Sequence, residues 1–126
     1  LKFEGNTAAF LMYSYVRILG IKRKIGPRAE ELLKTAELKL EHPSEIALAL
    51  HLAQFPEALK QVEEELLPNR LTDYLYELAN KFNAFFRDCR VEGTAEEASR
   101  LKLCDLTLNV LRDGFYILGI ETVDKM

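Results

Sequence analysis

The sequence has few of the features that mark membrane proteins, secreted proteins or metalloproteins. It has no continuous apolar run long enough to cross a bilayer, and its first residues, LKFEGN, resemble neither a signal peptide nor a transit peptide. Its two cysteines, Cys89 and Cys104, have no metal-ligand spacing and are too few for a disulfide framework. We therefore expect no membrane partner, no metal site and a reducing, intracellular setting.

Side chains arranged for catalysis are also scarce. His42 and His51 lie too far apart in sequence to form a local zinc-binding pair. The sequence pattern assembles no Ser-His-Asp or Cys-His arrangement, and it contains no glycine-rich phosphate loop. The sequence therefore predicts no catalytic residue and no cofactor site in this chain.

The chain lacks a strong charge of either sign, but its charge is unevenly distributed. The formal net charge is −3, unlike the strongly basic composition of a free-standing nucleic-acid binder. Residues 1–28 nevertheless hold six basic residues against one acidic residue, a formal charge of +5, which leaves −8 for the remainder. Such a basic end suits a polyanion, and its candidates for contacting phosphate are Lys22, Arg23, Lys24 and Arg28.

What the sequence does have is helical periodicity along nearly its whole length. With 126 residues, 48% of them hydrophobic, it is large enough for one domain with its own core. Apolar residues recur at helical spacing, and no alternating strand pattern occurs. We predict an all-α helical bundle of about five main helices that forms a single domain over residues 1–126. Because no methionine begins the chain, we expect a fragment of a longer protein.

Caps and prolines set the expected starts of the first helices. We expect a first helix from Asn6 or Thr7 to about Ile25, because either polar side chain can accept a free amide hydrogen of the first turn. Ser44 is expected to cap a short apolar helix, and Pro56 suits the first turn of the helix after it.

The last two helices carry further signals. Pro68 is expected to open one of them, whose core-facing stripe consists of Leu71, Leu75, Leu78, Phe82 and Phe85. Thr94 and Glu97 have the spacing of a capping box at the start of the final helix. Gly119 is expected to end that helix in a left-handed conformation.

The first predicted helix has two unlike faces. At about 100° per residue, an aliphatic side is formed by Ala8, Leu11, Met12, Tyr15, Ile18 and Leu19. The opposite side carries Phe10, Tyr13, Arg17 and Lys24. Aromatic rings can stack on unpaired bases, and a guanidinium can pair with phosphate. The spacing also suits a helix with two protein neighbours, in which Arg17 reaches past packed rings to solvent, and periodicity alone favours this second interpretation.

A resemblance to a known family favours the first interpretation. The string FEGNTAAFLMYSYVRI resembles the entry helix of the C-terminal anticodon-binding domain of arginyl-tRNA synthetases, where G-[ND]-T-x-x-Y-L-x-Y-x-x-x-R recurs. The likeness continues through FPEALKQ, LTDYLYELANKFNAFFRDCRV and SRLKLCDLTLNVLRDGFYILGIETVDKM, so it covers essentially the whole chain. The family's domain is an α-helical bundle named for an Asp-Ala-Leu-Arg signature, for which this chain has only the similar NVLR at 109–112.

The resemblance implies roles for individual residues. Phe10, Tyr13 and Arg17 stand where the family places anticodon-contacting aromatics and an arginine, although Phe10 lacks the hydroxyl of the usual tyrosine. Phe86 stands where a relative has an anticodon-contacting tyrosine. Met126 corresponds to the family's final methionine, which lies near the anticodon loop.

The resemblance also implies a parent protein, an arginine–tRNA ligase of the class I aminoacyl-tRNA synthetases. Its implied partners are the anticodon arm of arginine tRNA and the catalytic domain of the same chain. That catalytic domain uses ATP and magnesium, and it lies outside this sequence, which has no H-I-G-H-like or K-M-S-K-like motif. We expect this fragment alone to be non-catalytic, the protein to be a monomer, and its location to be cytoplasmic or, alternatively, organellar. The alternative function is a helical protein–protein interaction module that docks a partner through the same face.

Overall fold

Helices make up most of the chain. A computed structural model of the protein describes residues 5–124 and Met126. Within that part of the chain the helices are α1 (Gly5–Ile25), α2 (Arg28–Thr35), α3 (Pro43–Ala53), α4 (Phe55–Glu65), α5 (Pro68–Asp88) and α6 (Glu97–Leu118). The all-α prediction is confirmed, with five main helices and the eight-residue α2 in the connection after the first.

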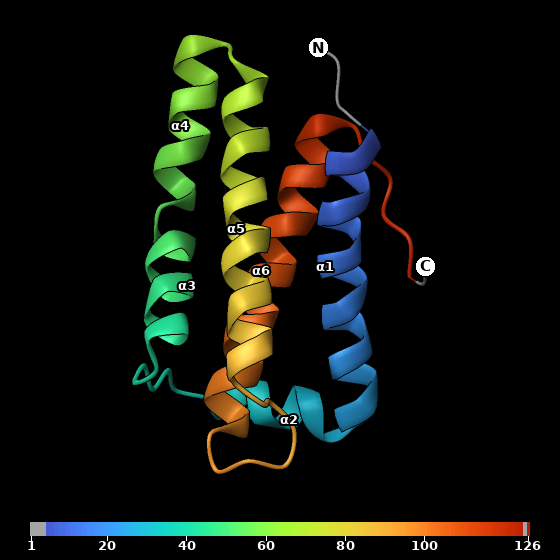
Figure 1. Ribbon diagram of the computed structural model, residues 1–126, viewed down its shortest axis with the longest axis vertical. Coiled ribbons are helices and arrows are strands. Elements are labelled where there is room, and N and C mark those ends of the chain that lie inside the picture. Colours follow the sequence, from blue (N-terminus) through green and yellow to red (C-terminus); the bar gives the residue numbers. More distant parts are fainter. Residues whose placement is uncertain (1–4, 125) are drawn as a thin grey trace.

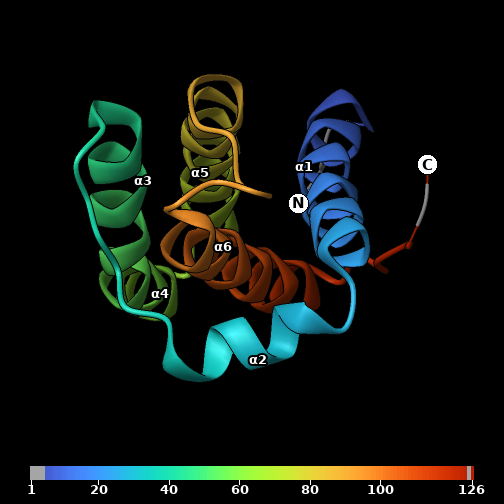
Figure 2. The same ribbon diagram turned by 90° about the horizontal axis from the view of Figure 1, so that it is seen from below.

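The helices pack around α5 and α6. Figure 2 shows α5 between α3 and α1, with α6 packed against the same row from one side. The shorter α3 and α4 follow one another along α5, and α2 crosses the end of the bundle against α6 (Figure 1). The side of the α1–α5 pair that faces away from α6 is therefore covered by no other helix of the described chain.

The predicted core stripe of α5 is confirmed. Leu71, Leu75, Leu78, Phe82 and Phe85 have no exposed surface, because this face of α5 meets helices on several sides. On α1, the buried side chains include Leu11, Tyr15 and Ile18, which belong to the predicted aliphatic face. Burial of a large apolar side chain contributes about 1.5–3 kcal/mol, so this shared core fixes α1 against α5.

Several helix ends agree with the sequence. Pro56 and Pro68 lie in the first turns of α4 and α5, where a proline sacrifices no helical hydrogen bond. α1 ends at Ile25 as expected, and Gly26 follows it with φ of 79°. Gly119 ends α6 with φ of 73°, a left-handed conformation that costs glycine little.

The predicted cap of α3 is wrong. The N-cap of α3 is His42, whose Nδ1 accepts a hydrogen bond of 3.0 Å from the amide of Ser44. Glu45 completes the capping box, because its carboxylate accepts a 2.8 Å hydrogen bond from the amide of His42. Pro43 occupies the first turn, so Ser44 lies inside the helix instead of before it.

Two other predicted caps are also wrong. α6 begins at Glu97, and the Thr94 hydroxyl donates backwards to the carbonyl of Val91 at 3.1 Å, which leaves a turn in front of the helix. The Glu97 carboxylate accepts instead from the amide of Gly93 at 2.7 Å and pairs with Arg28 at 2.8 Å. α1 begins at Gly5, which places the expected caps, Asn6 and Thr7, within its first turn.

Candidate nucleic-acid interface

Three of the predicted site residues lie along α1 on the side toward α5 and solvent. Tyr13 is 59% exposed, although tyrosine is a large aromatic residue. Phe10 is half-buried, and its ring centroid lies 5.2 Å from that of Tyr76 on α5. Phe10 therefore packs on a neighbouring helix, whereas Tyr13 presents its ring to solvent.

Arg17 is held against α5 by two contacts. Its guanidinium carbon lies 4.4 Å from the centroid of the Phe86 ring, within the range of a cation–π interaction. Its Nη1 donates a 2.8 Å hydrogen bond to Oδ1 of Asn83. Sequence reasoning places Arg17 and Phe86 in separate segments, and the fold brings them together.

The Asn83 side chain is fixed in turn by α1. Its Nδ2 donates to Oγ of Ser14 at 3.2 Å, and Ser14 is only 1% exposed. The Ser14 hydroxyl donates to the carbonyl of Phe10 at 3.4 Å. This chain of hydrogen bonds orients the amide of Asn83 so that its oxygen faces the guanidinium, and the remaining donors of Arg17 stay available to a ligand.

Tyr76 and Asn83 complete the site and are absent from the sequence prediction. Together with Phe86 they lie at i, i+7 and i+10 of α5, a spacing that places them on one helix face. That periodicity is a signal that could have found them. We call the resulting surface the α1–α5 face, which consists of Phe10, Tyr13, Arg17, Tyr76, Asn83 and Phe86.

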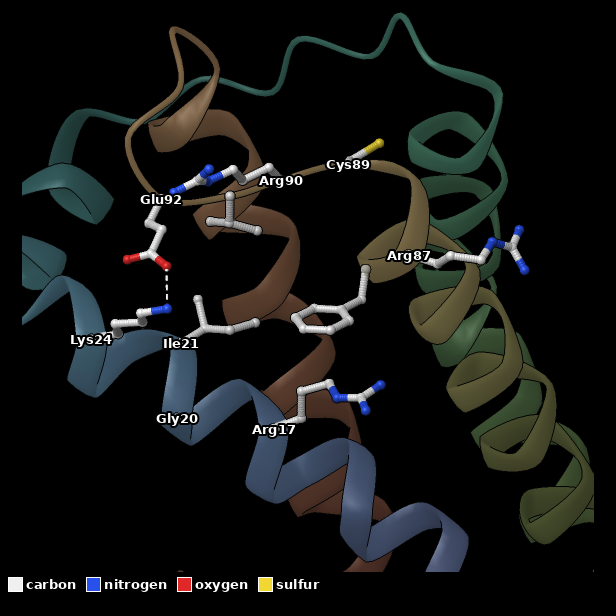
Figure 3. Close-up of a pocket in the computed structure, with 10 residues that line it drawn as sticks. Arg17, Gly20, Ile21, Lys24, Arg87, Cys89, Arg90 and Glu92 are labelled. Carbon is white, nitrogen blue, oxygen red and sulfur yellow. Dashed lines mark ion pairs between the residues drawn. The ribbon is translucent and has the colours of Figure 1, made fainter.

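A pocket of about 390 Å³ continues the α1–α5 face toward the end of the bundle where α5 stops. Figure 3 shows Gly20, Ile21 and Lys24 of α1 on one side of it, and Arg90 and Glu92 of the segment after α5 on the other. Lys24 and Glu92 form an ion pair of 2.8 Å across this gap. The pocket is therefore bounded by both apolar and charged groups.

Two groups beside the pocket have shifted pKa values, the Cys89 thiol and the Asp88 carboxyl group. Burial raises the pKa of the Cys89 thiol above its ordinary value, so Cys89 contributes an uncharged side chain to the wall. Hydrogen bonds from Arg87 and Ser44 lower the pKa of Asp88 to about 2. Asp88 therefore remains a carboxylate, and it holds Arg87 through a 2.9 Å contact with Nε.

The predicted phosphate contacts do not form one patch. Lys22 pairs with Asp105 of α6 at 2.9 Å and is largely covered, and Arg28 pairs with Glu97 at 2.8 Å. Lys24 is exposed at the mouth of the pocket, where it pairs with Glu92. Arg23 is exposed and lines a shallow depression with Lys22, between α1, α2 and α6.

Met126 lies at the end of a segment that runs beside α1. Figures 1 and 2 both place this segment on the side of α1 away from α5. The Met126 side chain is 62% exposed. It is therefore accessible to a ligand that spans α1, although it does not belong to the α1–α5 face.

A metal-binding cluster and a membrane-spanning helix are both absent from the residues that the structure describes. No group of three or more His, Cys, Asp or Glu side chains there has an arrangement that could hold a metal ion. Within residues 5–124 and Met126, no helix combines the length and the apolarity that a membrane span requires.

Comparisons with known proteins point to one family. The sequence profile of the DALR anticodon binding domain matches residues 11–126. An arginine–tRNA ligase of Protochlamydia amoebophila is 60% identical over 126 residues, which are all of this chain and 22% of the relative. A cytoplasmic arginine–tRNA ligase of Arabidopsis thaliana is 46% identical over all of this chain and 21% of its own length.

Solved structures show the same likeness. The arginyl-tRNA synthetase of Plasmodium falciparum superposes with a TM-score of 0.86 and 35% identity over 98% of this chain and 22% of that protein. The Thermus thermophilus arginyl-tRNA synthetase gives a TM-score of 0.74 and 29% identity over 99% of this chain and 22% of that protein. The chain thus spans about a fifth of the length of the relatives that it matches.

Proposed function

This chain belongs to the DALR anticodon binding domain family, and we propose that it binds the anticodon arm of arginine tRNA as part of a longer arginine–tRNA ligase. The observation that carries the proposal is the α1–α5 face. It presents exposed rings beside an arginine whose position is fixed by Asn83 and Phe86. Single-stranded RNA loops offer the splayed bases and the phosphates that such a surface recognises.

The aromatic residues supply stacking surfaces. Tyr13 is 59% exposed, so its ring is open to an unpaired base without any rearrangement of the bundle. Tyr76 and Phe86, with 43% and 39% of their surface exposed, extend this platform onto α5. Phe10 packs against Tyr76 and offers no hydroxyl, so in this chain it acts by packing and stacking alone.

The cationic residues supply the contacts to base edges and phosphates. Among the described residues, Asn83 bonds Nη1 of Arg17, and we assign the remaining guanidinium donors to a base edge or a phosphate. Lys24 and Arg23 are exposed and follow the RNA backbone, where they carry no base information. Lys22 and Arg28 contribute mainly to the fold, because Lys22 is largely covered beside Asp105 and both Nη atoms of Arg28 bond the carboxylate of Glu97. Met126 contacts the loop from the far side of α1.

Covalent chemistry is assigned to the rest of the polypeptide. ATP supplies the activation of arginine there, together with magnesium, and no step of that reaction involves a residue of this chain. Among the described residues, no group of three or more His, Cys, Asp or Glu side chains could hold a metal ion. We propose residues 1–126 as one domain of a monomeric cytoplasmic enzyme. An organellar location is the second candidate, because one relative is named as chloroplastic or mitochondrial.

The proposal is tested by Tyr13→Ala and Arg17→Ala in the full polypeptide. Loss of one stacked base costs about 1–3 kcal/mol, so the specificity constant for charging arginine tRNA should fall by about five- to 150-fold in Tyr13→Ala. Arg17→Ala should lose a comparable amount. The matched controls are Tyr116→Ala and Arg70→Ala, which remove an exposed tyrosine and an exposed arginine away from the face. Unchanged specificity constants in both face variants would refute the assignment.

The alternative function, a module that docks a protein partner, predicts a different response to salt. Rings and arginine are common in protein interface hot spots, so the α1–α5 face also suits such a partner. RNA binding through Arg17, Arg23 and Lys24 should release about three counterions, which corresponds to a slope near −2 in log K against log salt concentration. A protein partner held by the rings should respond much less.

A further inference from the structure

The outward side of α3 is apolar, unlike the outward sides of its neighbours. From Ile46 to Ala53 every residue except His51 is apolar. A helix that is apolar on all sides is normally buried on all sides. The core covers one side of α3, where Leu48 has no exposed surface, but Ile46 and Leu50 are 40% and 63% exposed. The exposed positions of α4 and α5 are instead mainly polar, so the outward side of α3 has the character of a contact surface.

A cavity beside α3 extends this apolar surface to α6. Ile46, Ala49 and Leu50 lie at i, i+3 and i+4, so they share one side of α3. Ala49 also lines a cavity of about 280 Å³ between α3, α6 and the segment that connects α2 to α3. All the residues that line the cavity are apolar, and two of them on α6, Leu106 and Val110, are only partly buried. We call this surface the α3–α6 face, which consists of Leu38, Ile46, Ala49, Leu50, Leu106 and Val110.

The chemistry of the α3–α6 face does not suit RNA. Its side chains are aliphatic, so they offer neither a ring for stacking nor a charge for phosphate. The face also lies on the α6 side of the bundle, whereas the α1–α5 face looks away from α6 (Figure 2). An apolar partner could therefore cover the α3–α6 face and leave the α1–α5 face open.

The length of the relatives indicates which partner is available. This chain corresponds to 22% of the Protochlamydia amoebophila relative, so most of that polypeptide lies outside the matched region. Contiguous apolar surface on a folded domain commonly marks an interaction site. Two domains of one chain meet at a high effective concentration, because the linker keeps them close. The remainder of the same polypeptide is thus the partner that the α3–α6 face meets most often.

We propose that the α3–α6 face docks the catalytic domain of the same polypeptide, and that this contact positions the α1–α5 face relative to the site of arginine transfer. Ile46 and Leu50 pack on an apolar surface of that domain, and the cavity beside them receives one of its apolar side chains. The inference rests on the proposed function, because it takes the chain to be part of an arginine–tRNA ligase. The other possible occupant is a second copy of the polypeptide.

Cysteine labelling of the full polypeptide tests whether the face is covered. Leu50→Cys places a thiol on the outward side of α3, and the control Leu66→Cys places one after α4, where the leucine is 80% exposed. Peptide mass spectrometry after maleimide labelling gives the rate for each thiol. Compared with the unfolded polypeptide, Leu50→Cys should react at least about tenfold more slowly, because the reagent reaches it only when the domains separate. Leu66→Cys should react nearly as fast as in the unfolded polypeptide.

Dilution identifies what covers the face. Protection by a domain of the same chain is independent of protein concentration, whereas protection by a second copy is lost on dilution. A Leu50→Cys rate close to that of the unfolded polypeptide overturns the inference. Protection that disappears on dilution also overturns it, because the occupant is then a second copy.

Leu50→Glu tests whether the contact positions the RNA site. The variant should lower the specificity constant for charging arginine tRNA by about tenfold or more, because a carboxylate in an apolar contact loses its hydration. Its affinity for the anticodon stem-loop should stay native, which also shows that the bundle is folded. Leu66→Glu, the matched control, should charge the tRNA like the native protein. Native charging by Leu50→Glu would overturn the positioning role.

The outcomes separate this inference from the function on which it rests. If Tyr13→Ala and Arg17→Ala leave charging unchanged while Leu50→Cys stays protected at every concentration, the anticodon assignment fails and the domain contact stands. If Tyr13→Ala and Arg17→Ala lower charging while Leu50→Cys reacts freely, only the domain contact is wrong.

Discussion

The position of the Arg17 side chain depends on Asn83, a residue that no sequence motif identifies. The guanidinium has four rotatable bonds behind it, and ordering it on binding would cost conformational entropy. Its hydrogen bond to Asn83 and its contact with Phe86 order it before any ligand arrives. The affinity of the α1–α5 face therefore depends on Asn83, which need not touch the RNA itself.

Asn83→Ala tests this dependence. The variant removes the acceptor for Nη1 of Arg17, and we expect binding of the anticodon stem-loop to weaken by about two- to twelvefold, because ordering one long side chain on binding costs about 0.5–1.5 kcal/mol. The loss should disappear when Arg17→Ala is already present, as a double-mutant cycle measures. Full additivity of the two losses would contradict the coupling.

Glu45 shows how a buried charge ties stability to pH. It is 1% exposed, and although burial by itself raises its pKa, hydrogen bonds from the backbone of His42 and the side chain of Arg100 lower the pKa below the ordinary value of 4.5. The ionised carboxylate is therefore stabilised by folding. This stability is fully present above about pH 4.5 and is lost as the pH falls through the lower pKa of the folded state.

Glu45→Gln should reveal that dependence. At neutral pH the variant should be about 1–3 kcal/mol less stable, because the hydrogen bond from Arg100 loses its charged acceptor. The difference in unfolding free energy should shrink as the pH falls below 4.5, since the native side chain then protonates. Urea titrations of both proteins at several pH values measure it. A difference that is independent of pH would show that the charge of Glu45 is not the cause.

The sequence predicts which segments are helical better than it predicts the residue that caps each helix. The apolar spacing of α5 predicts the core stripe from Leu71 to Phe85, because residues that recur at helical spacing share the face that packs against neighbouring helices. Pro68 and Gly119 mark ends through backbone geometry, which is local. The cap at Ser44 fails for a local reason, because His42 accepts the hydrogen bond from the amide of Ser44. The cap at Thr94 fails because Glu97 bonds Arg28 and the amide of Gly93, and the contact with Arg28 arises only in the tertiary fold.

The capping correction can be measured directly. His42→Ala should destabilise the protein by about 1 kcal/mol, because the amide of Ser44 loses its acceptor at the start of α3. Thr94→Ala should cost less than half of that, since its hydroxyl caps no helix. Thermal or urea unfolding of the two variants compares them. A larger effect at Thr94 than at His42 would restore the cap that the sequence suggested.

The close contact between α5 and α6 leaves no room for a side chain at Gly114. Gly114 and Leu75 are both fully covered, and a Cβ at Gly114 would lie 2.6 Å from Cδ1 of Leu75. We expect Gly114→Ala to destabilise the protein by about 1–3 kcal/mol through overpacking, even though alanine is the better helix former. Leu75→Ala in the same chain should recover part of that loss. A Gly114→Ala variant with raised stability would contradict the close approach.

Across the bundle, the site arises from two helices that the sequence separates by more than forty residues. Periodicity within α1 predicts that Phe10, Tyr13 and Arg17 share one side, and the structure agrees. Spacing alone does not predict that Tyr76 and Asn83 meet them, because that depends on how α1 crosses α5. Spacing likewise does not predict ion pairs between distant segments. The sequence suggested Lys22 and Arg28 as phosphate contacts, whereas in the fold they pair with Asp105 and Glu97.

The distribution of charge over the molecule agrees with an RNA contact at one place only. The net charge is −3, so the protein as a whole does not attract a polyanion. The RNA binding that we propose should therefore depend on the α1–α5 face and on the exposed Arg23 and Lys24. An anticodon arm should be recognised there through its bases, with phosphate contacts in a supporting role.

Exchanging the anticodon measures that recognition most directly. The ratio of affinities is determined for arginine tRNA and for the same tRNA with its anticodon replaced, using the full polypeptide and its Tyr13→Ala, Arg17→Ala double variant. We predict a native ratio of about ten- to 150-fold, because a hydrogen bond from the Arg17 guanidinium to a base edge contributes about 1.5–3 kcal/mol, and a ratio near one for the variant. A folded variant that keeps the native ratio would contradict anticodon recognition by this face.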